Sequence, residues 1–362
     1  MFSLHIDTAR TWRGGQSQVL MTVLGLRELG HRAALVAHPA GALLQRASEG
    51  LELIPLAPRS EMDFSAAWRL SRVLRQLKPD VVHVHDSHAA AMAASALSMA
   101  SPRPCPPIVM SRRVDFHIRK NALSRWKYNQ VARFVCASDA IRRILIADGV
   151  DAARTTVVHD GVDLSRLDAV PEASIHEAFW LPHQAPVVAN VAALVPHKGQ
   201  RHLVEAAAQV VQQLPDARFV IFGEGELRES LEKQIKTHGL EKHVLLAGFR
   251  PDVLSLCKTI DLFAMSSVTE GLGSAVLDAM ACRKAVVATT AGGLPEAVVD
   301  GETGALVAPR DDRALADAIV RLLGDAPLRT SLGEAGRRRV EEHFSAEKMV
   351  AGIVRVYDTL LA

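Results

Sequence analysis

The feature that most limits how this 362-residue chain can fold is a regular alternation of short apolar runs with longer amphipathic stretches. In α/β proteins, short buried parallel strands alternate in this way with the helices that connect them. In the first half, strands are expected at residues 4–7, 33–37, 51–54, 81–85, 108–111, 133–137 and 156–159. In the second half, they are expected at residues 187–191, 218–222, 244–247, 262–265, 285–289 and 305–307. The pattern predicts two similar, doubly wound, Rossmann-like modules.

The alternation is interrupted between about residues 165 and 184, a mixed segment that contains Pro171 and Pro182. We place the domain boundary near residue 168, which gives an N-terminal domain over 1–168 and a C-terminal domain over 169–345. Residues 346–362 predict a last helix with no strand after it, and one hypothesis is that it packs back across the first domain. Ligands of doubly wound sheets bind beyond the carboxyl ends of the strands, so two facing modules would form an interdomain cleft there.

Composition narrows the class of protein. Apolar residues make up 49% of the chain and charged residues 23%, which is enough for two cores and argues against disorder. The N-terminus has no basic leader, and no apolar stretch approaches the roughly 20 residues that span a bilayer. The four cysteines lack metal or C-x-x-C spacing and are expected to be free thiols. We therefore expect a cytoplasmic protein.

Positive charge is concentrated in the first half. Residues 1–169 hold 22 Lys and Arg against 15 Asp and Glu, whereas the remainder holds 20 against 25. The densest segment carries Arg112, Arg113, Arg119, Lys120, Arg125, Lys127, Arg133, Arg142 and Arg143. Such a field attracts anionic groups, so a solvated helical face, an anionic acceptor and a membrane surface all remain open as interpretations. The segment has no signature of a nucleic-acid-binding module, and no nucleic-acid partner is expected.

The segment with the strongest chemical signal runs from Ser266 to Ala281, after an apolar strand and into a helix. Gly271 and Gly273 permit close approach of the backbone, and a helix N-terminus offers N–H groups to an anion. Glu270 stands just before the turn, and Asp278 follows two helical turns later. One carboxylate can hold a sugar hydroxyl and the other a ribose diol. The alternative interpretation is a structural helix that begins with a glycine turn.

Other glycine-containing turns also follow predicted strands. Lys198-Gly199 lies between a strand and a helix, where the lysine can neutralise a pyrophosphate. The turn that contains Gly223 and the loop that contains Phe249 and Arg250 can line a nucleotide pocket, although ligand-free structural turns are equally good interpretations. Gly14-Gly15, near Arg10 and Arg13, suits a loop that faces phosphate. It does not match G-x-G-x-x-G, so a nicotinamide cofactor is not expected.

A run of histidines ends the strand at 81–85. His83 and His85 lie on one face of that strand. Three interpretations remain open: satisfied structural histidines, a metal site, and a catalytic or substrate-binding His85. The sequence places no further ligand set nearby, and no metal is expected.

Taken together, these segments resemble glycosyltransferase family 4, also called glycosyl transferases group 1, which has the GT-B fold. The resemblance extends over nearly the whole chain. Its further supports are the segments 80–85, 157–163, 291–298 and 300–304.

The resemblance implies retaining transfer of a sugar from a nucleotide-sugar donor, with no cofactor and no obligatory metal, in agreement with the lack of an Asp-x-Asp motif. Lys198 would stabilise the leaving diphosphate, Glu270 would hold donor sugar hydroxyls, and His85 would lie near the reacting sugar. The implied donor-binding residues are Gly15, Asp278, Gly271, Leu272, Gly273, Ser274, Gly223, Phe249 and Arg250. The first domain would bind the acceptor.

The sequence departs from the family pattern at three positions. Ala193 stands five residues before the lysine, where the family commonly has an arginine, so one fixed positive charge is missing. Asp278 replaces the second glutamate of the usual E-x7-E pair, and Asp160 replaces the asparagine of Asn-Gly-Val-Asp.

The leading hypothesis is an enzyme that builds a glycan or glycolipid of the bacterial lipopolysaccharide type. Its basic first domain would suit a phosphorylated or membrane-embedded acceptor, with peripheral association at the inner face of the membrane. The alternatives are a catalytically degenerate partner or scaffold subunit, and a nucleotide-sugar epimerase on the same fold.

Overall fold

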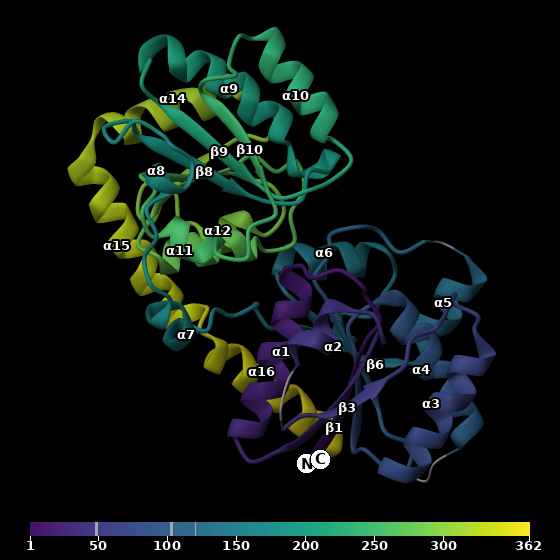
Figure 1. Ribbon diagram of the computed structural model, residues 1–362. Helices are drawn as coiled ribbons and strands as arrows, with labels where there is room; N and C mark the ends of the chain where they lie inside the picture. Colours follow the sequence, from purple (N-terminus) through teal and green to yellow (C-terminus); the bar gives the residue numbers. More distant parts are fainter. Residues whose placement is uncertain (48–49, 102–103, 120) are drawn as a thin grey trace. The chain divides into compact units, whose positions relative to one another are not determined.

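A computed structural model describes residues 1–47, 50–101, 104–119 and 121–362. The chain divides into two compact units, each coloured along the sequence in Figure 1. The first unit comprises Met1–Gly161 together with Ala346–Ala362, and the second comprises Val162–Ser345. Lys120, one of the basic residues noted above, lies outside the described residues.

The first unit is built on a seven-stranded parallel sheet with the strand order β3-β2-β1-β4-β5-β6-β7. The strands are β1 (Phe2–Asp7), β2 (Arg32–Ala37), β3 (Glu52–Pro55), β4 (Val81–Val84), β5 (Ile108–Arg112), β6 (Val131–Cys136) and β7 (Thr155–Val157). The strand order changes direction between β1 and β4. Their carboxyl ends therefore form the switch point at which doubly wound sheets bind ligands.

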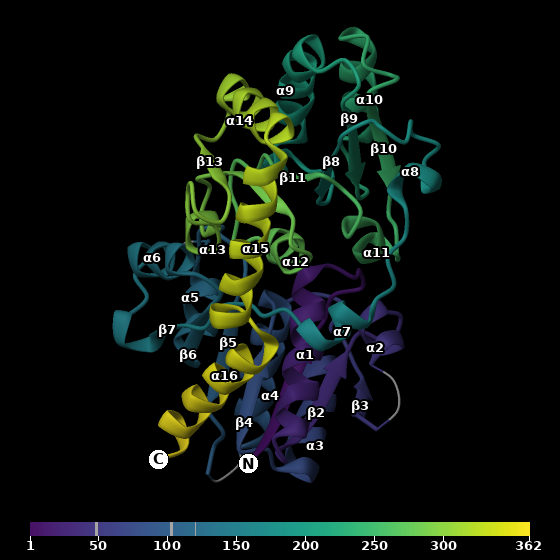
Figure 2. The ribbon, with the colours of Figure 1, turned by 90° about the vertical axis from the view of Figure 1, so that its left-hand side faces the viewer.

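Helices cover both faces of this sheet. On one face, α1 (Gly14–Glu28) and α16 (Ala346–Leu361) lie side by side and share a core with the strands, as Figure 2 shows. That core includes Val23, Val135 and Ile353. On the other face, α3 (Phe64–Leu77) packs against α4 (Ser87–Ala100). The remaining helices are α2 (Ala42–Arg46), α5 (Ala122–Asn129) and α6 (Asp139–Ala147).

The second unit repeats the plan with a six-stranded parallel sheet of order β10-β9-β8-β11-β12-β13. The strands are β8 (Val187–Val191), β9 (Arg218–Phe222), β10 (Val244–Gly248), β11 (Leu262–Met265), β12 (Ala285–Thr289) and β13 (Ala305–Val307). Here the switch point lies between the adjacent strands β8 and β11.

One face of this sheet shares an apolar core with α9 (Gln200–Gln213), α10 (Arg228–Thr237) and α14 (Asp312–Gly324). On the other face, α12 (Ser274–Ala281) packs against α15 (Ala326–His343). The short helices are α7 (Leu164–Ala169), α8 (Ile175–Ala178), α11 (Val253–Cys257) and α13 (Leu294–Ala297).

The first unit ends at Gly161, seven residues before the boundary placed near 168. Val162, the first residue of the second unit, donates to the carbonyl oxygen of Phe344 at 2.8 Å, and an ion pair then holds α7 in that unit. Asp168 accepts two hydrogen bonds of 2.8 Å from the Arg337 guanidinium on α15, through Nη1 and Nη2. Arg337 also donates to the carbonyl oxygen of Ala281, so the segment after Gly161 is fixed to α12 and α15.

The expected strands agree closely with the structure, and the largest differences are at strand ends. β4 ends at Val84, so His85 is the first residue beyond the strand. Among the described residues, no helix is both long enough and apolar enough to cross a membrane.

Candidate functional site

Lys198 and Glu270 lie together at the switch point of the second unit. Lys198 follows β8 in a short 3₁₀ turn (Pro196–Lys198), and Glu270 follows the neighbouring strand β11. At Gly199, the backbone of the loop after β8 lies directly against the backbone of the loop after β11. Gly199 has φ of +65°, and a Cβ there would lie 2.1 Å from the carbonyl oxygen of Ser266. Glycine at position 199 is therefore required for packing.

The two side chains form a nearly buried ion pair. Lys198 Nζ donates to Glu270 Oε1 at 2.8 Å and to Oε2 at 2.6 Å, with side-chain exposures of 20% and 9%. The hydroxyl of Ser267 and the amide of Gly271 also donate to this carboxylate. Thr289 fixes the loop by donating to the carbonyl oxygen of Ser267 at 2.6 Å. The lysine and glutamate are thus pre-positioned, with each charge compensated by the other.

Two consecutive glycines in the loop after β12 support Glu270. Gly292 has φ of +52°, and a Cβ at that position would lie 1.8 Å from the carbonyl oxygen of Glu270. The amide of Gly293 donates to the same oxygen at 3.2 Å. The segment 291–298, which matches the family pattern, thus has a physical role in positioning Glu270.

The turn from Gly271 to Ser274 leads from Glu270 into α12. Leu272 is buried and anchors the turn, while Gly273 is the N-cap with φ of +95° and carries no capping side chain. The amide of Val276 donates to the carbonyl oxygen of Gly273 at 2.9 Å, whereas the amides of Ser274 and Ala275 find no acceptor among the described residues. This arrangement presents N–H groups and the positive end of the helix dipole next to the ion pair, which is suitable for an anionic ligand.

Asp278 lies on the same helix in a largely desolvated position. Burial raises the pKa of its carboxyl to about 7. Within the described parts of the chain, no hydrogen bond to its side chain is found. A carboxyl group of this kind exchanges hydrogen bonds with hydroxyls in either protonation state.

The other predicted donor-binding residues of the second unit differ in their environments. Gly223, with φ of +131°, is required because a Cβ would lie 2.0 Å from the carbonyl oxygen of Ala192, and its amide donates to Gly248. Phe249 is 52% exposed. The Arg250 guanidinium is already engaged by both carboxylate oxygens of Asp252 at 2.7 and 2.6 Å. Gly223 therefore has a packing role, whereas Phe249 is free to contact a ligand.

In the first unit, the residues after β1 and β4 lie at the corresponding switch point. Gly15 lies in the first turn of α1, and a Cβ there would meet nothing within 4 Å. Asp7, at the end of β1, accepts hydrogen bonds from the amide of Ala9 and from Gln16 Nε2. Burial and the nearby Asp86 raise the Asp7 pKa to about 6. Sequence reasoning passed over Asp7 because a strand-end aspartate carries no motif.

His83 and His85 do share a face of the sheet, and the fold adds a third histidine that the sequence analysis missed. His5 on β1 pairs in register with His83 on β4. One ligand atom from each of the three rings lies within 4.8 Å of the others. The expectation that no further ligand set lies nearby is therefore wrong, because neighbouring strands bring together residues 78 positions apart in sequence. Parallel pairing of 2–7 with 81–84 was the signal that could have revealed it.

His85 is held by both of its ring nitrogens. Its Nε2 lies 3.1 Å from His5 Nδ1, and its Nδ1 lies 3.2 Å from Arg113 Nη1. Arg113 also donates to Asp160 through Nε at 2.7 Å. Burial, aided by the Arg113 charge, lowers the pKa of His5 to about 3 and holds the pKa values of His83 and His85 well below their usual value. These shifts favour the neutral form of all three rings.

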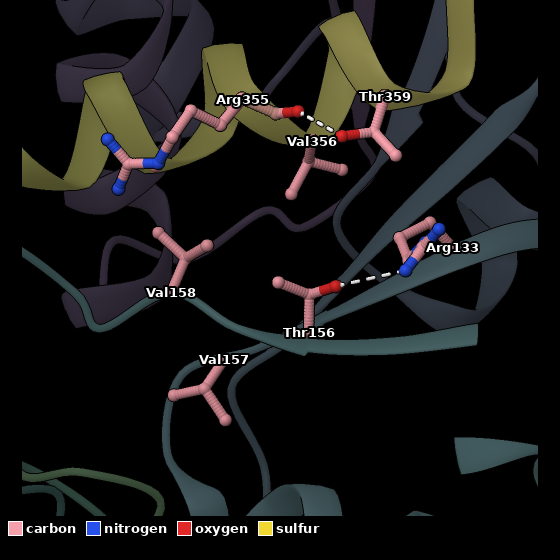
Figure 3. A pocket seen from close by; sticks show the side chains of 8 residues that line it. Arg133, Thr156, Val157, Val158, Arg355, Val356 and Thr359 are labelled. Atoms are coloured by element: carbon pink, nitrogen blue, oxygen red, sulfur yellow. Dashed lines mark hydrogen bonds between the residues drawn. The ribbon is translucent and has the colours of Figure 1, made fainter. Parts of the chain in front are cut away.

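A separate cavity of about 140 Å³ lies between α16 and the strands β6 and β7 (Figure 3). Arg133, Thr156, Val158 and Arg355 are among its lining residues, and Arg133 donates to the Thr156 hydroxyl at 3.3 Å. None of the predicted catalytic or donor-binding residues lines this cavity, although Arg133 belongs to the basic segment of the first half. The switch points, rather than this cavity, bring the predicted residues together.

Two family profiles match the chain. The profile described as "Glycosyltransferase Family 4" matches residues 12–166, and that described as "Glycosyl transferases group 1" matches residues 172–339. Together they extend over most of both units.

Several curated proteins are similar in sequence to part of this chain. A lipopolysaccharide core biosynthesis glycosyltransferase of Rhizobium meliloti, LpsE, is 35% identical over 181 residues, which are 50% of this chain and 51% of that protein. N-acetyl-alpha-D-glucosaminyl L-malate synthase of Bacillus anthracis is 32% identical over 164 residues, or 45% and 43% of the two chains. The chain spans about half the length of the curated relatives it matches.

Solved structures share the fold over its whole length. Anabaena HepE in complex with UDP-glucose has a TM-score of 0.86 at 22% identity, with 99% of this chain and 100% of that chain covered. Sucrose-phosphate synthase from Thermosynechococcus elongatus has a TM-score of 0.81 at 20% identity, with 99% and 98% covered.

Proposed function

Because the chain belongs to glycosyltransferase family 4 and has its GT-B fold, we propose that it transfers a sugar from a nucleotide-sugar donor to a glycan or glycolipid acceptor. We further propose that transfer retains the anomeric configuration and requires no metal ion or other cofactor. The observation that carries the proposal is the Lys198–Glu270 ion pair beside the N-terminus of α12.

In this proposal, the diphosphate of the donor binds where positive charge converges. Lys198 Nζ neutralises the charge that develops on the leaving diphosphate, and the amides of Gly273 and Ser274 donate to phosphate or sugar oxygens. Fixed donors of this kind stabilise the developing charge without reorganising as the bond breaks. No nucleophile from the enzyme is needed, because the acceptor hydroxyl attacks from the same face as the leaving group.

Glu270 and Asp278 bind the hydroxyl groups of the donor. Glu270 accepts from the sugar hydroxyls once Lys198 has turned toward phosphate, and its remaining contacts with Ser267 and Gly271 keep it in place. Asp278 takes the ribose diol. The exposed ring of Phe249 offers a surface against which a base stacks.

We assign the acceptor to the first unit, whose excess of basic residues suits a phosphorylated or membrane-embedded glycolipid. Two relatives support a surface-glycan role: LpsE of Rhizobium meliloti, and a phosphatidylinositol monomannoside mannosyltransferase of Corynebacterium glutamicum that is 36% identical over 172 residues. We accordingly place the protein in the cytoplasm, with peripheral association at the inner face of the membrane.

A second candidate is a catalytically degenerate partner or scaffold subunit. It is favoured by Ala193, which leaves Lys198 as the one lysine or arginine of the loop from Ala192 to Gly199. Loss of one partner for transition-state charge typically lowers a rate by about a hundredfold or more. The two candidates differ in whether nucleotide diphosphates bind.

The test is a thermal-shift screen of UDP-, GDP- and ADP-sugars, followed by product detection with glycolipid acceptors. A ligand that binds the folded state raises the melting temperature by mass action. We expect one nucleotide class to shift it and the matching donor to support transfer. If no nucleotide sugar binds at millimolar concentration, the scaffold interpretation replaces this one.

A further inference from the structure

We propose that Arg113 is the oxyanion-binding residue of the first unit. Its guanidinium is held in one orientation by Asp160 and by a one-way chain of hydrogen bonds that ends at Ser111. The proposal that this oxyanion belongs to a substrate rests on the proposed function, whereas the hydrogen-bond chain stands on geometry alone.

The direction of the chain is set at Arg113, because a guanidinium donates hydrogen bonds and never accepts them. His85 Nδ1, 3.2 Å from Arg113 Nη1, must therefore be an acceptor. The neutral His85 ring then carries its proton on Nε2. That N–H donates to His5 Nδ1 at 3.1 Å, which places the proton of the neutral His5 ring on Nε2 as well.

The remaining links follow from the same reasoning. His5 Nε2–H donates to Ser3 Oγ at 3.1 Å and also faces the hydroxyl oxygen of Tyr357 on α16 at 3.5 Å. The Tyr357 hydroxyl donates to His83 Nδ1 at 2.6 Å. His83 Nε2–H finally donates to Ser111 Oγ at 2.8 Å. Every one of the three rings is thereby assigned the same tautomer, with hydrogen on Nε2.

The hydrogen-bond chain is a network in which each histidine nitrogen already has a partner, rather than an empty cation site. All six ring nitrogens of His5, His83 and His85 have a hydrogen-bond partner. A metal ion would have to break these bonds next to the positive charge of Arg113, which is only 15% exposed and compensated by Asp160. Buried networks in which every member is satisfied hold their side chains in one arrangement.

This arrangement leaves part of the Arg113 fork available. Asp160 uses Nε–H and His85 uses one N–H of Nη1, and the described residues offer no partner for the remaining N–H groups. The residue follows β5 directly, at the carboxyl edge of the sheet. Ser111, Arg113 and Asp160 also border a cavity of about 10 Å³, so both ends of the chain meet at one point. A fixed guanidinium fork matches a phosphate or carboxylate group.

The functional test uses Arg113→Met, with Arg69→Met, an exposed arginine on α3 outside the basic segment, as the matched control. Inorganic phosphate is titrated into each protein, and transfer kinetics are measured with phosphorylated and unphosphorylated acceptors. We expect Arg113→Met to weaken phosphate binding at least about tenfold and to raise KM, in line with the loss of a charge-assisted contact. A higher KM for the phosphorylated acceptor alone assigns the oxyanion to the acceptor, and a higher KM for the donor assigns it to the diphosphate. Unchanged phosphate binding and unchanged KM values would overturn the proposal.

The structural test is nitrogen NMR of the histidine side chains, which needs no enzymatic activity and so separates this proposal from the proposed function. We expect His5, His83 and His85 to be neutral Nε2–H tautomers at about pH 6. Arg113→Met should give mixed tautomers at His5 and His85, whereas Tyr357→Phe should leave His85 unchanged and alter His83. A proton on His85 Nδ1 in the wild type, or metal-coordination shifts on adding zinc, would refute the one-way chain.

Discussion

Lys198 Nζ lies 2.8 Å from one carboxylate oxygen of Glu270 and 2.6 Å from the other, in loops that follow adjacent parallel strands. Both residues are therefore positioned before any ligand binds, and each neutralises the other. A diphosphate that approaches Lys198 must compete with Glu270 for the ammonium group. Because of this competition, substitutions in the ion pair should change diphosphate binding and sugar transfer differently.

Glu270→Gln should separate these two steps. The amide removes the negative charge that competes for Lys198, so affinity for a nucleoside diphosphate should be retained or increased. Transfer should fall by about a hundredfold, because the hydroxyl acceptor that orients the sugar is weakened. Calorimetry with UDP and GDP, together with initial rates, checks both parts. The exposed Glu229→Gln on α10 is the control, and equal transfer rates in the two variants would contradict the assignment.

Asp278→Asn should change how stability depends on pH. The folded-state pKa is about 7 against 3.8 for the free group, so the folded protein holds an extra proton between these values. Stability contributed by this site is therefore lost as the pH rises from about 4 to about 7. The Asn variant should exceed the wild type by on the order of 4 kcal/mol at pH 8 and by about zero near pH 4. Urea unfolding at the two pH values measures the difference, and a pH-independent difference would argue against a buried, unpaired carboxyl.

Gly15→Ala should lower activity without lowering stability. A Cβ at residue 15 meets nothing within 4 Å, and alanine in a helix gains about 0.5–1 kcal/mol over glycine. If the backbone of Gly15 approaches the donor phosphate, transfer should fall at unchanged or higher melting temperature. Gly324→Ala, at another open position on α14, is the control and should leave transfer unchanged.

Gly292→Ala should instead lower the stability of the protein. Its Cβ would lie 1.8 Å from the carbonyl oxygen of Glu270, at a φ of +52°. We expect a loss of about 3 kcal/mol or more, with the Glu270 loop displaced. Thermal unfolding gives the loss, and an unchanged melting temperature would show that the loop packs differently.

Arg337→Met should destabilise the second unit by roughly 2 kcal/mol. The substitution leaves Asp168 and the carbonyl oxygen of Ala281 without their shared donor, and it removes the link between α7 and α15. The neighbouring, exposed Arg338→Met is the control. Protease cleavage near residue 168 should increase in Arg337→Met alone. Equal cleavage in both variants would contradict the claim that Arg337 holds α7 in the second unit.

Most of the fold could be predicted from the sequence, since each buried strand is a short apolar run of its own. The boundary near 168 was less accurate because it depends on Asp168 and Arg337, which lie 169 positions apart in the chain. Local patterns carry no information about such a contact. The same limit applies to Arg113, which the sequence placed in a general basic segment without distinguishing it from its neighbours.

The site of the second unit was more accessible because its residues follow strands that are adjacent at the switch point. Lys198 was selected by its position at the carboxyl end of a strand, and Glu270 by the glycine-containing turn that leads from a strand into a helix. Neither pattern revealed that Gly223 is needed against Ala192 for packing, or that Asp252 engages Arg250. In both cases the tertiary partner, rather than the residue type, decides whether a side chain or backbone group is available to a ligand.

The most direct test of the account is transfer from the donor identified by screening, measured with Lys198→Ala beside the exposed control Lys233→Ala. We predict that Lys198→Ala keeps the wild-type melting temperature within a few degrees and loses at least about a hundredfold in kcat/KM, while Lys233→Ala matches the wild type. Wild-type transfer by Lys198→Ala would contradict the central claim that this lysine stabilises a leaving diphosphate.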